Sequence, residues 1–509
     1  MLEEYIDLAR RVDKTFLLCS LGIATAFLLL REALVTRAKL KAIPTVGSSA
    51  FLTSWKDSFK SVFHVRDIIE EGYRTHYGGV FKIPFPDKWM IIVTGDEKMN
   101  DIRKASNEQL SFADASVDVF QLDHTLGHRI SADPYEVGVI RGPLTRNIIA
   151  CFADVQDEIK EAFNDYIPMN KDWTEIPAYR TALQIICRAS NRMFVGLPLC
   201  RNRDYIDLNI NFTVNVTAYA HFLNLFPSFL KPVLGSVFTP RRRATAKMEK
   251  FLGETITERL RQDDLHGKDW PGKPNDLISW LIDATKGRSE RRTVRDLVLR
   301  VLVLNFAAIH TTSITFTTAL YALAAHPECV QALRDEVEAA IAEEGLTKAA
   351  MAKMNRLDSF IKEAQRRYGS INVFSMARYV KKDFVFSDGT VVPAGNHIAV
   401  AAQSIHMDEG KYDNPLDFKP WRFHDMRKEE GEANRHQMIS LDFDYVLFGN
   451  GRPACPGRFF AVNELKILMS HVLVNFDVKM DKVPEAGWFL SDRFLNPDGK
   501  VLFRKRTAV

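Results

Sequence analysis

The chain has few cysteines for its length, and they are widely spaced. Its 509 residues include six, at positions 19, 151, 187, 200, 329 and 455, and none lie in a C-x-x-C pair. A structural zinc site needs grouped cysteine or histidine ligands, so this spacing argues against one. Scattered single cysteines also indicate a reducing compartment.

The chain also lacks a strong charge of either sign and lacks low-complexity segments. A formal net charge of +4 is too small to favour nucleic-acid binding. There is no Gly/Ser-rich linker and no internal repeat to divide the chain, while 46% hydrophobic residues are ample for a core. We therefore expect one large, mainly helical domain over residues 41–509, behind a short N-terminal segment over residues 1–40.

That N-terminal segment contains the longest uncharged run near the start of the chain. Phe16 to Leu30 is fifteen residues without charge, and the apolar pattern resumes after Arg31-Glu32. A spanning helix needs about 20 apolar residues, so the run is slightly short and its flanking charges are expected to snorkel. Cations that follow it favour a cytosolic location for the rest of the chain. A cleaved signal peptide, with Ala24-Thr25-Ala26 as its processing site, is the alternative.

A Gly/Pro-built loop late in the chain places one cysteine at its tip. It reads Phe448-Gly449-Asn450-Gly451-Arg452-Pro453-Ala454-Cys455-Pro456-Gly457-Arg458. The glycines permit a tight turn and the prolines stiffen it. Loop amides can then point at the sulfur and stabilise a thiolate that is bound to iron. The alternative is a buried structural thiol, the usual fate of a free cysteine.

The loop resembles the F-x-x-G-x-R-x-C-x-G haem loop of the cytochrome P-450 monooxygenases. Phe448, Gly451, Cys455 and Gly457 match that motif, and Gly449 adds a further turn residue. The arginine departs from it, because Pro453 holds its place and Arg452 stands one residue earlier. The resemblance implies that Cys455 is the axial ligand of haem b and that Arg452 contacts a haem propionate.

Two further motifs carry the same resemblance. Glu363-Ala364-Gln365-Arg366 lies in a predicted helix over 359–368, and Phe418 to Phe423 includes Pro420 and Arg422. An isolated Glu–Arg pair is usually a solvated contact of little value. In the family, however, the E-x-x-R pair locks to the arginine of a P-x-R-F segment behind the haem. The resemblance therefore assigns Glu363, Arg366 and Arg422 to that structural cluster.

A long helix is predicted from Leu297 to Ala325, and its centre resembles the oxygen-binding helix of the same family. Small residues at Ala307 and Ala308 would let the backbone approach the haem and leave room for dioxygen. Thr311, with Thr312 beside it, would supply a hydroxyl that passes on protons. His310 replaces the family's acid. It is either a proton relay, since its pKa lies near neutrality, or a packing residue.

The family's Trp-x-x-x-Arg propionate motif is incomplete here, because Val137 stands four residues before Arg141. Arg141 is the candidate for that contact, and Arg146 is the rival. A surface location is the alternative for each.

The resemblance implies a mainly α fold with a small β-rich lobe, the cytochrome P-450 fold, behind an N-terminal transmembrane helix in the endoplasmic reticulum membrane. Electrons would come from NADPH through a separate reductase, with cytochrome b5 as an optional second donor, because the chain has no flavin or nucleotide fingerprint. Arg458 and Lys466 are candidate docking charges, with solvated surface as the alternative.

The predicted substrate segments are mostly apolar, which favours a hydrophobic substrate. They are residues 110–130, 214–225, 305–308, 371–374 and 489–490. By analogy with fungal secondary-metabolism oxidases, we expect oxidation of a terpenoid, specifically diterpenoid, skeleton. The alternatives are a steroid or fatty-acid hydroxylase, a haem-thiolate isomerase or dehydratase that does not use O2, and a haem-binding sensor. The stretch 221–239 is either a packed loop or a second membrane contact.

Overall fold

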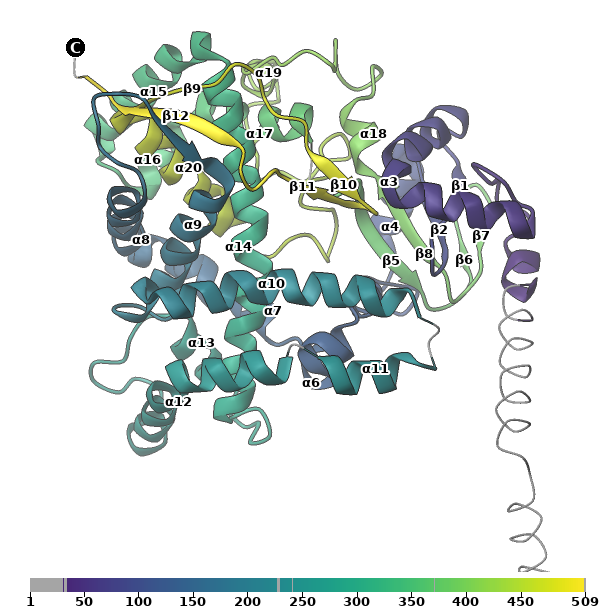
Figure 1. Ribbon diagram of the computed structural model, residues 1–509, viewed down its shortest axis with the longest axis horizontal. Coiled ribbons are helices and arrows are strands. Elements are labelled where there is room, and N and C mark those ends of the chain that lie inside the picture. The colour runs from purple at the N-terminus through teal and green to yellow at the C-terminus, as the bar shows by residue number, and fades with distance from the viewer. Residues whose placement is uncertain (1–30, 32–33, 227–228, 240, 370, 508–509) are drawn as a thin grey trace, which may run out of the picture.

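The computed structural model describes residues 31, 34–226, 229–239, 241–369 and 371–507. The membrane helix expected at residues 16–30 lies outside this part of the chain. The described chain is mostly helical, as expected (Figure 1). Its α-helices are α3 (Phe51–Thr75), α4 (Asp96–Lys104), α5 (Phe112–Val119), α6 (His128–Ala132), α7 (Glu136–Val139), α8 (Thr145–Tyr166), α9 (Ala178–Phe194), α10 (Arg203–Asn224), α11 (Lys231–Phe238), α12 (Arg241–His266), α13 (Leu277–Ala284), α14 (Val294–Ala325), α15 (Val330–Glu344), α16 (Lys348–Lys353), α17 (Asn355–Tyr368), α18 (Ala402–His406), α19 (Arg422–Met426) and α20 (Arg458–Asn475).

The helix expected at 297–325 is α14, the central element of the helical part. It begins at the N-cap Thr293, whose side chain accepts from the Asp296 N–H. It ends before His326-Pro327, because proline cannot continue a helix. Helices α9, α10, α12, α17 and α20 all pack against it. Within the described residues it is the one helix long and apolar enough to cross a membrane, and most of its apolar window is buried inside the protein.

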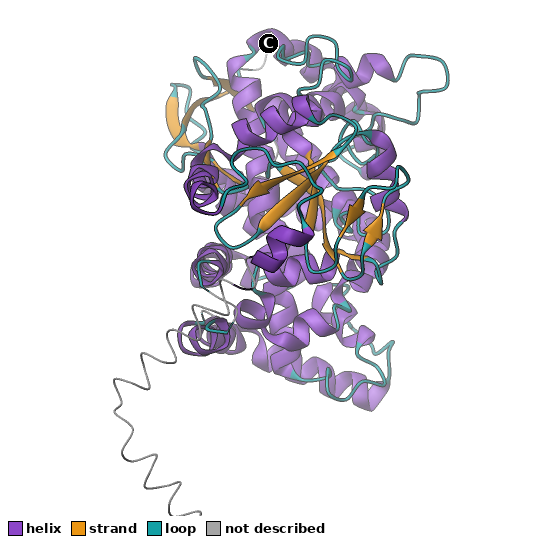
Figure 2. Ribbon diagram, turned by 90° about the vertical axis from the view of Figure 1, so that its right-hand side faces the viewer, coloured by secondary structure: helices purple, strands orange, loops and turns teal. Residues whose placement is uncertain are grey.

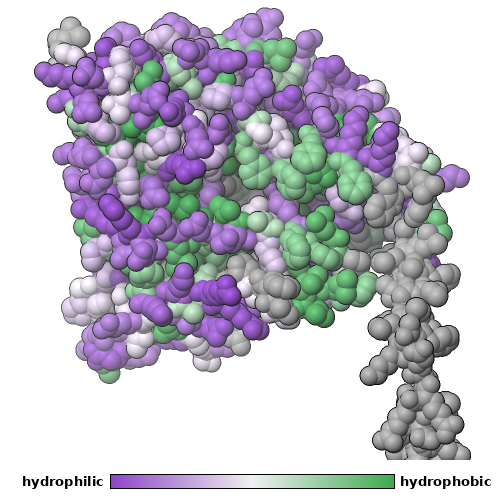
Figure 3. Space-filling model, viewed as in Figure 1, coloured by the Kyte–Doolittle hydropathy of each residue, from purple (hydrophilic) through white to green (hydrophobic). Residues whose placement is uncertain are grey.

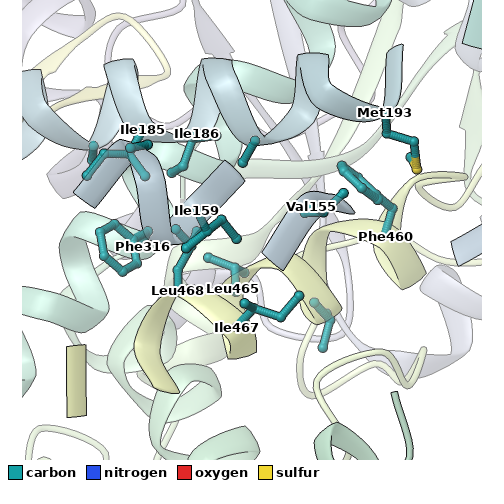
Figure 4. Packing of buried hydrophobic residues seen from close by; sticks show 14 of the residues in the cluster. Val155, Ile159, Ile185, Ile186, Met193, Phe316, Phe460, Leu465, Ile467 and Leu468 are labelled. Carbon is teal, nitrogen blue, oxygen red and sulfur yellow. The ribbon is translucent and has the colours of Figure 1, made fainter. Parts of the chain in front are cut away.

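The main hydrophobic core lies where α8, α9, α14 and α20 meet (Figure 4). Apolar residues of α8 and α9, such as Ile159 and Ile186, face Phe316 of α14 and Leu468 of α20. These four side chains are at most 2% exposed. Burying a side chain of this size stabilises the fold by about 1.5–3 kcal/mol. The core therefore fixes α20, and with it the loop that precedes it.

The β-rich lobe is a five-stranded sheet beside the helices (Figure 2). Its order is β1 (Val80–Pro84), β2 (Trp89–Val93), β8 (His397–Ala401), β5 (Phe374–Val380) and β3 (Leu110–Ser111). Strands β1 and β2 form an antiparallel hairpin. Strand β8 lies parallel to β2 and antiparallel to β5.

Strand β5 contains a bulge that changes the direction of its side chains. The register with β8 shifts between Ser375 and Arg378. Met376, inside the bulge, has a φ of 50°, which is uncommon for a residue with a side chain. Past the bulge, Arg378 is buried.

Smaller sheets complete the fold. A three-stranded sheet pairs β12 with strands on both sides, and two hairpins stand apart. The hairpin β6–β7 flanks the turn at Gly389. The bounds are β4 (Thr174–Pro177), β12 (Lys500–Lys505), β9 (Phe476–Lys479), β10 (Gly487–Phe489), β11 (Asp492–Phe494), β6 (Phe384–Val385) and β7 (Val391–Val392).

Candidate active site

The cysteine loop is closed by a backbone hydrogen bond and by two left-handed glycines. The Cys455 N–H donates to the Phe448 carbonyl oxygen at 2.9 Å. Gly449 and Gly451 have φ values of 68° and 72°, a region that side chains disfavour. A Cβ on Gly451 would also lie 2.9 Å from the Arg103 carbonyl oxygen. The loop therefore needs glycine at this position both for its backbone angle and for the close approach.

The Cys455 sulfur faces the first amides of α20. Burial raises the pKa of this thiol, while the N–H groups of Gly457 and Arg458 and the Arg458 charge lower it. Positive charge and helix N-terminal amides favour a thiolate over a thiol. The effect of burial is the larger one and keeps the pKa of the free thiol raised, and a bound cation would shift the group toward the thiolate.

The two candidate docking charges occupy different environments. Arg458 lies in the loop itself, where it donates to the Cys455 carbonyl oxygen at 3.0 Å and covers the Phe459 ring. Lys466 is only 7% exposed and pairs with Asp358 at 2.8 Å. The expectation that Lys466 is a docking charge was therefore wrong, because Lys466 lies on the face of α20 that is buried in the helical core.

The structure brings the three residues of the structural cluster together. Both carboxylate oxygens of Glu363 accept from Arg366, at 2.8 and 2.9 Å, and from the Arg422 Nε at 3.2 Å. Glu363 and Arg366 are fully buried. Arg366 also donates to the carbonyl oxygens of His406 and Pro415, at 2.6 and 2.8 Å. The cluster therefore joins α17 to the segments that follow β8.

One stripe in the middle of α14 is exposed although most of the helix is buried. Ala307 and Thr311 are four residues apart and hence on one face, and both are exposed. The Thr311 hydroxyl donates to the Ala307 carbonyl oxygen at 2.8 Å. Ala308 is half-buried beside them, and Thr312 is 5% exposed on an adjacent face. The open stripe thus carries Ala307 and Thr311.

His310 is held by hydrogen bonds at both ring nitrogens. Its Nδ1 lies 3.1 Å from the Tyr179 hydroxyl of α9, and its Nε2 lies 3.0 Å from the Ile210 carbonyl oxygen of α10. A carbonyl only accepts, so Nε2 carries the proton. Burial lowers the pKa of His310, which favours the neutral ring. The ring therefore joins three helices, as the packing alternative expects.

A buried arginine that the sequence analysis did not single out lies on the sheet. Arg378 of β5 is 3% exposed, and burial lowers its pKa to about 10. Its guanidinium donates to the neighbouring Ala377 carbonyl oxygen, at 2.8 Å. Among the described residues it has no carboxylate partner, and a buried cation without one is costly. Arg378 is thus suited to an anionic group of a bound molecule.

The arginines expected from sequence to bind propionates lie at the surface of the same region. Arg141, in the π-helical turn Ile140–Leu144, donates to the Arg452 carbonyl oxygen at 2.8 Å. Arg141, Arg146 and Arg452 are all exposed. The structure therefore places Arg141 against the cysteine loop, and the propionate roles of Arg141 and Arg452 stay predictions.

Comparisons with known proteins show which family this sequence resembles. The family model for cytochrome P-450 matches residues 42–499. The chain belongs to the cytochrome P-450 family. Cytochrome P-450 monooxygenase 151 of Postia placenta is 42% identical over 92% of this chain and 94% of its own. Cytochrome P-450 monooxygenase CYP512U6 of Ganoderma lucidum is 32% identical over 92% of each chain.

A solved structure gives the same fold. The retinoic acid bound cyanobacterial CYP120A1 aligns with a TM-score of 0.63 and 18% identity, over 91% of this chain and 98% of that one. At that identity the likeness concerns the fold alone. The predicted P-450 fold is thus confirmed, and the family match and the monooxygenase relatives confirm the assignment as an oxidoreductase of the monooxygenase type.

The residues of the site fit haem with a thiolate-ligated iron. The Cys455 sulfur is flanked by amide donors, and a Cβ on Gly449 or Gly457 would meet no atom within 4 Å. These positions leave room for a flat ring against the loop, and Ala307 and Thr311 are open on α14. Cys455 would ligate the iron, and Arg378 would pair with a propionate.

The expected substrate segments are brought together in part. Phe306 of α14 and Phe120, which follows α5, pack edge to face with ring centroids 5.6 Å apart. Phe374 packs on Phe85 at 5.9 Å. Asn305 is different, because it is fully buried and accepts from the Asn191 side chain at 2.7 Å. Its expected substrate contact was therefore wrong.

We expect Arg378→Met to speed haem loss by about tenfold, since one charge-assisted hydrogen bond to a propionate is removed. Stability of the haem-free protein should stay the same or rise, because an unpaired buried cation disappears. Haem transfer to apomyoglobin measures the first effect and thermal unfolding the second. Arg452→Met and Arg141→Met are the matched comparisons. A transfer rate that Arg378→Met leaves unchanged would show that Arg378 does not contact the haem.

Proposed function

We propose that this monooxygenase hydroxylates or successively oxidises a terpenoid skeleton, specifically a diterpenoid, in secondary metabolism. The observation that carries the proposal is the aromatic pair Phe120–Phe306 next to the open stripe of α14. An apolar site rimmed by aromatic side chains suits a rigid hydrocarbon skeleton. The fungal relatives are consistent with this class of enzyme, although their names give no substrate.

Haem with a cysteinate ligand supplies the oxygen chemistry when it is bound. The chain's own residues do the rest. Phe120 and Phe306 exclude water and orient an apolar substrate beside Ala307. The Thr311 hydroxyl, which donates to the Ala307 carbonyl oxygen, can rotate its proton toward the open side of the stripe. Thr311 is thus the group in the described site best placed to hold and pass on a proton.

A spectral titration of the purified ferric protein tests the substrate class. Diterpene, steroid and fatty-acid scaffolds of similar size form the panel, and we expect a diterpene to shift the Soret band to high spin. A response only to steroids or fatty acids would overturn the terpenoid proposal. Turnover of a bound scaffold without NADPH would instead support an isomerase or dehydratase.

We expect Thr311→Ala to raise severalfold the fraction of NADPH that is lost as peroxide, because proton delivery then lacks its hydroxyl. Thr311→Ser, which keeps the hydroxyl, should restore coupling. Product formed per NADPH consumed is the measurement. If Thr311→Ala couples as well as the unmodified enzyme, the proton path does not use Thr311.

The proposed electron donor is NADPH through a separate cytochrome P-450 reductase, with cytochrome b5 as a second donor. Arg458 is half-buried next to the Cys455 carbonyl oxygen, and we propose it as one of the cations that the reductase contacts. Reductase-dependent reduction should weaken as ionic strength rises, since exposed charges are screened.

We further propose a single-pass location in the endoplasmic reticulum membrane with the catalytic domain in the cytosol. Figure 3 shows an apolar surface near α3 and α11. The exposed apolar side chains of this surface include Phe59, Phe63, Leu225, Phe229 and Val233. A patch of this kind suits a lipid surface. The sequons at Asn211 and Asn215 should then carry no sugar. Finding glycan there on the expressed protein would overturn this orientation.

A further inference from the structure

A second cavity lies between α6, the start of α12 and the start of α14, apart from the open stripe of α14. It is a cavity of about 400 Å³, a volume within the range of small-molecule sites. Leu126, Ile130 and Leu299 provide its apolar walls. Leu299 and Thr311 are twelve residues apart on one helix, which is about 18 Å at 1.5 Å per residue. The haem site is therefore not part of this cavity.

Two arginines face the cavity without acidic partners. Among the described residues, neither Arg241 of α12 nor Arg295 of α14 forms an ion pair. The Arg241 guanidinium makes one long hydrogen bond, to the Asp123 carbonyl oxygen at 3.5 Å. Burial and the neighbouring cations Arg242 and Arg295 lower its pKa. Cations so grouped favour an anion between them.

The place of Arg241 depends on the absence of a side chain at Gly127. An ideal Cβ there would clash with the Arg241 Nη1. Gly127 has a φ of 105°, which also excludes most other residues. The guanidinium thus packs directly on the backbone of α6's N-cap, at the wall of the cavity.

The hydroxyl of Thr245 is the second observation that indicates a ligand. Thr245 lines the cavity and is 2% exposed, and its Oγ1 has no hydrogen-bond partner among the described residues. An unpaired buried hydroxyl is costly, and threonine in a helix usually bonds a carbonyl of the preceding turn. The hydroxyl is therefore available to a bound molecule.

One carboxylate also lines the cavity, but its charge is already matched. Asp296 accepts from the Tyr135 hydroxyl at 2.9 Å and from the Arg300 Nε at 3.4 Å. Arg291 lies 3.6 Å from its other oxygen. His128, which also lines the cavity, is exposed and lies 3.3 Å from Asp123. Arg241 and Arg295 are thus left with positive charge that the surrounding acids do not neutralise.

We propose that this cavity binds an amphipathic carboxylic acid, with its carboxylate between Arg241, Arg295 and Thr245 and its apolar body against Leu126, Ile130 and Leu299. Guanidinium and hydroxyl donors recognise a carboxylate well, and the apolar walls require a hydrocarbon portion. The site is a second ligand site of the enzyme, next to the first two turns of α14, and does not depend on the identity of the substrate.

The test is photocrosslinking of the full-length, haem-loaded protein with a diazirine-bearing dodecanoic acid. We expect labelled peptides from residues 126–130 or 293–299, and competition by dodecanoate but not by dodecanol. Arg241→Gln should weaken labelling about tenfold. Arg295→Gln should weaken labelling about threefold, because Arg295 is exposed and its charge is screened. Lys250→Gln removes an exposed cation further along the same helix, outside the lining of the cavity, and should leave labelling unchanged.

Thr245→Val separates binding from folding. The fold makes no use of this hydroxyl, so the melting temperature should stay the same or rise while labelling falls severalfold. Equal competition by dodecanol, labelling that is indifferent to Arg241→Gln and Thr245→Val, or labels only on the apolar surface near α3 and α11 would each overturn the site. Displacement by inorganic phosphate or anionic phospholipid vesicles, but not by dodecanoate, would overturn the carboxylic acid assignment.

Discussion

Cys455→Ser should abolish the thiolate carbon monoxide spectrum and reduce oxygenation to background. Serine has a shorter side chain and a hydroxyl that does not ionise under these conditions, so the amides of Gly457 and Arg458 would face a neutral group. Any haem that remains bound would lack the electron donation of a cysteinate. The measurement is the carbon monoxide difference spectrum of the reduced protein, taken beside NADPH-supported turnover.

Cys151→Ser is the matched control for this experiment. Cys151 is buried in α8, burial raises its pKa to about 11, and its sulfur contacts the Asn275 carbonyl oxygen at 3.5 Å. A serine can keep that contact, so the spectrum should not change. An unchanged thiolate spectrum in Cys455→Ser would show that another group ligates the iron.

Glu363→Gln should destabilise the holoprotein by about 3–5 kcal/mol, the range for breaking a buried ion pair. The carboxylate accepts from both Arg366 and Arg422, so the substitution leaves two guanidiniums in the interior with no anion. We expect a low yield of haem-loaded protein and a strongly lowered denaturation midpoint. Denaturant unfolding followed by Soret absorbance measures this effect.

The chain offers a control with the same spacing. Glu258 and Arg261 of α12 also form an E-x-x-R pair, but both side chains are more than half exposed. Exposed pairs of this kind contribute little, so Glu258→Gln should not change the midpoint measurably. If Glu363→Gln fails to accumulate, Arg422→Lys keeps a cation and should show a smaller loss. A midpoint unchanged in Glu363→Gln would mean that the cluster is not structural.

These two E-x-x-R pairs show how far sequence alone could reach. Spacing does not distinguish Glu363–Arg366 from Glu258–Arg261. Only the downstream segment with Pro420 and Arg422 identified Glu363–Arg366 as the structural pair. The cysteine loop was predictable because its glycines and ligand lie within a few residues. Helix α14 was predictable because its apolar pattern is long and ends at a proline.

The parts that the sequence did not predict depend on three-dimensional register. Arg378 is buried because the bulge at Met376 shifts the alternation of side-chain directions along β5. No sequence pattern predicts a bulge there. Asn305 is buried because Asn191, more than a hundred residues away, faces it. Lys466 is buried in the helical core because it forms an ion pair with Asp358 there. Each outcome depends on a distant partner rather than on local composition.

The three-helix contact at His310 couples the position of α10 to the turn of α14 that carries Thr311. Helix α10 is tied through the Ile210 carbonyl oxygen to the residue directly preceding Thr311. A displacement of α10 that widened the site would pull on the very turn of α14 that carries the open stripe, and Tyr179 anchors that turn to α9. A change that moved α10 would therefore also move the Thr311 hydroxyl, so the width of the site and the position of that hydroxyl vary together.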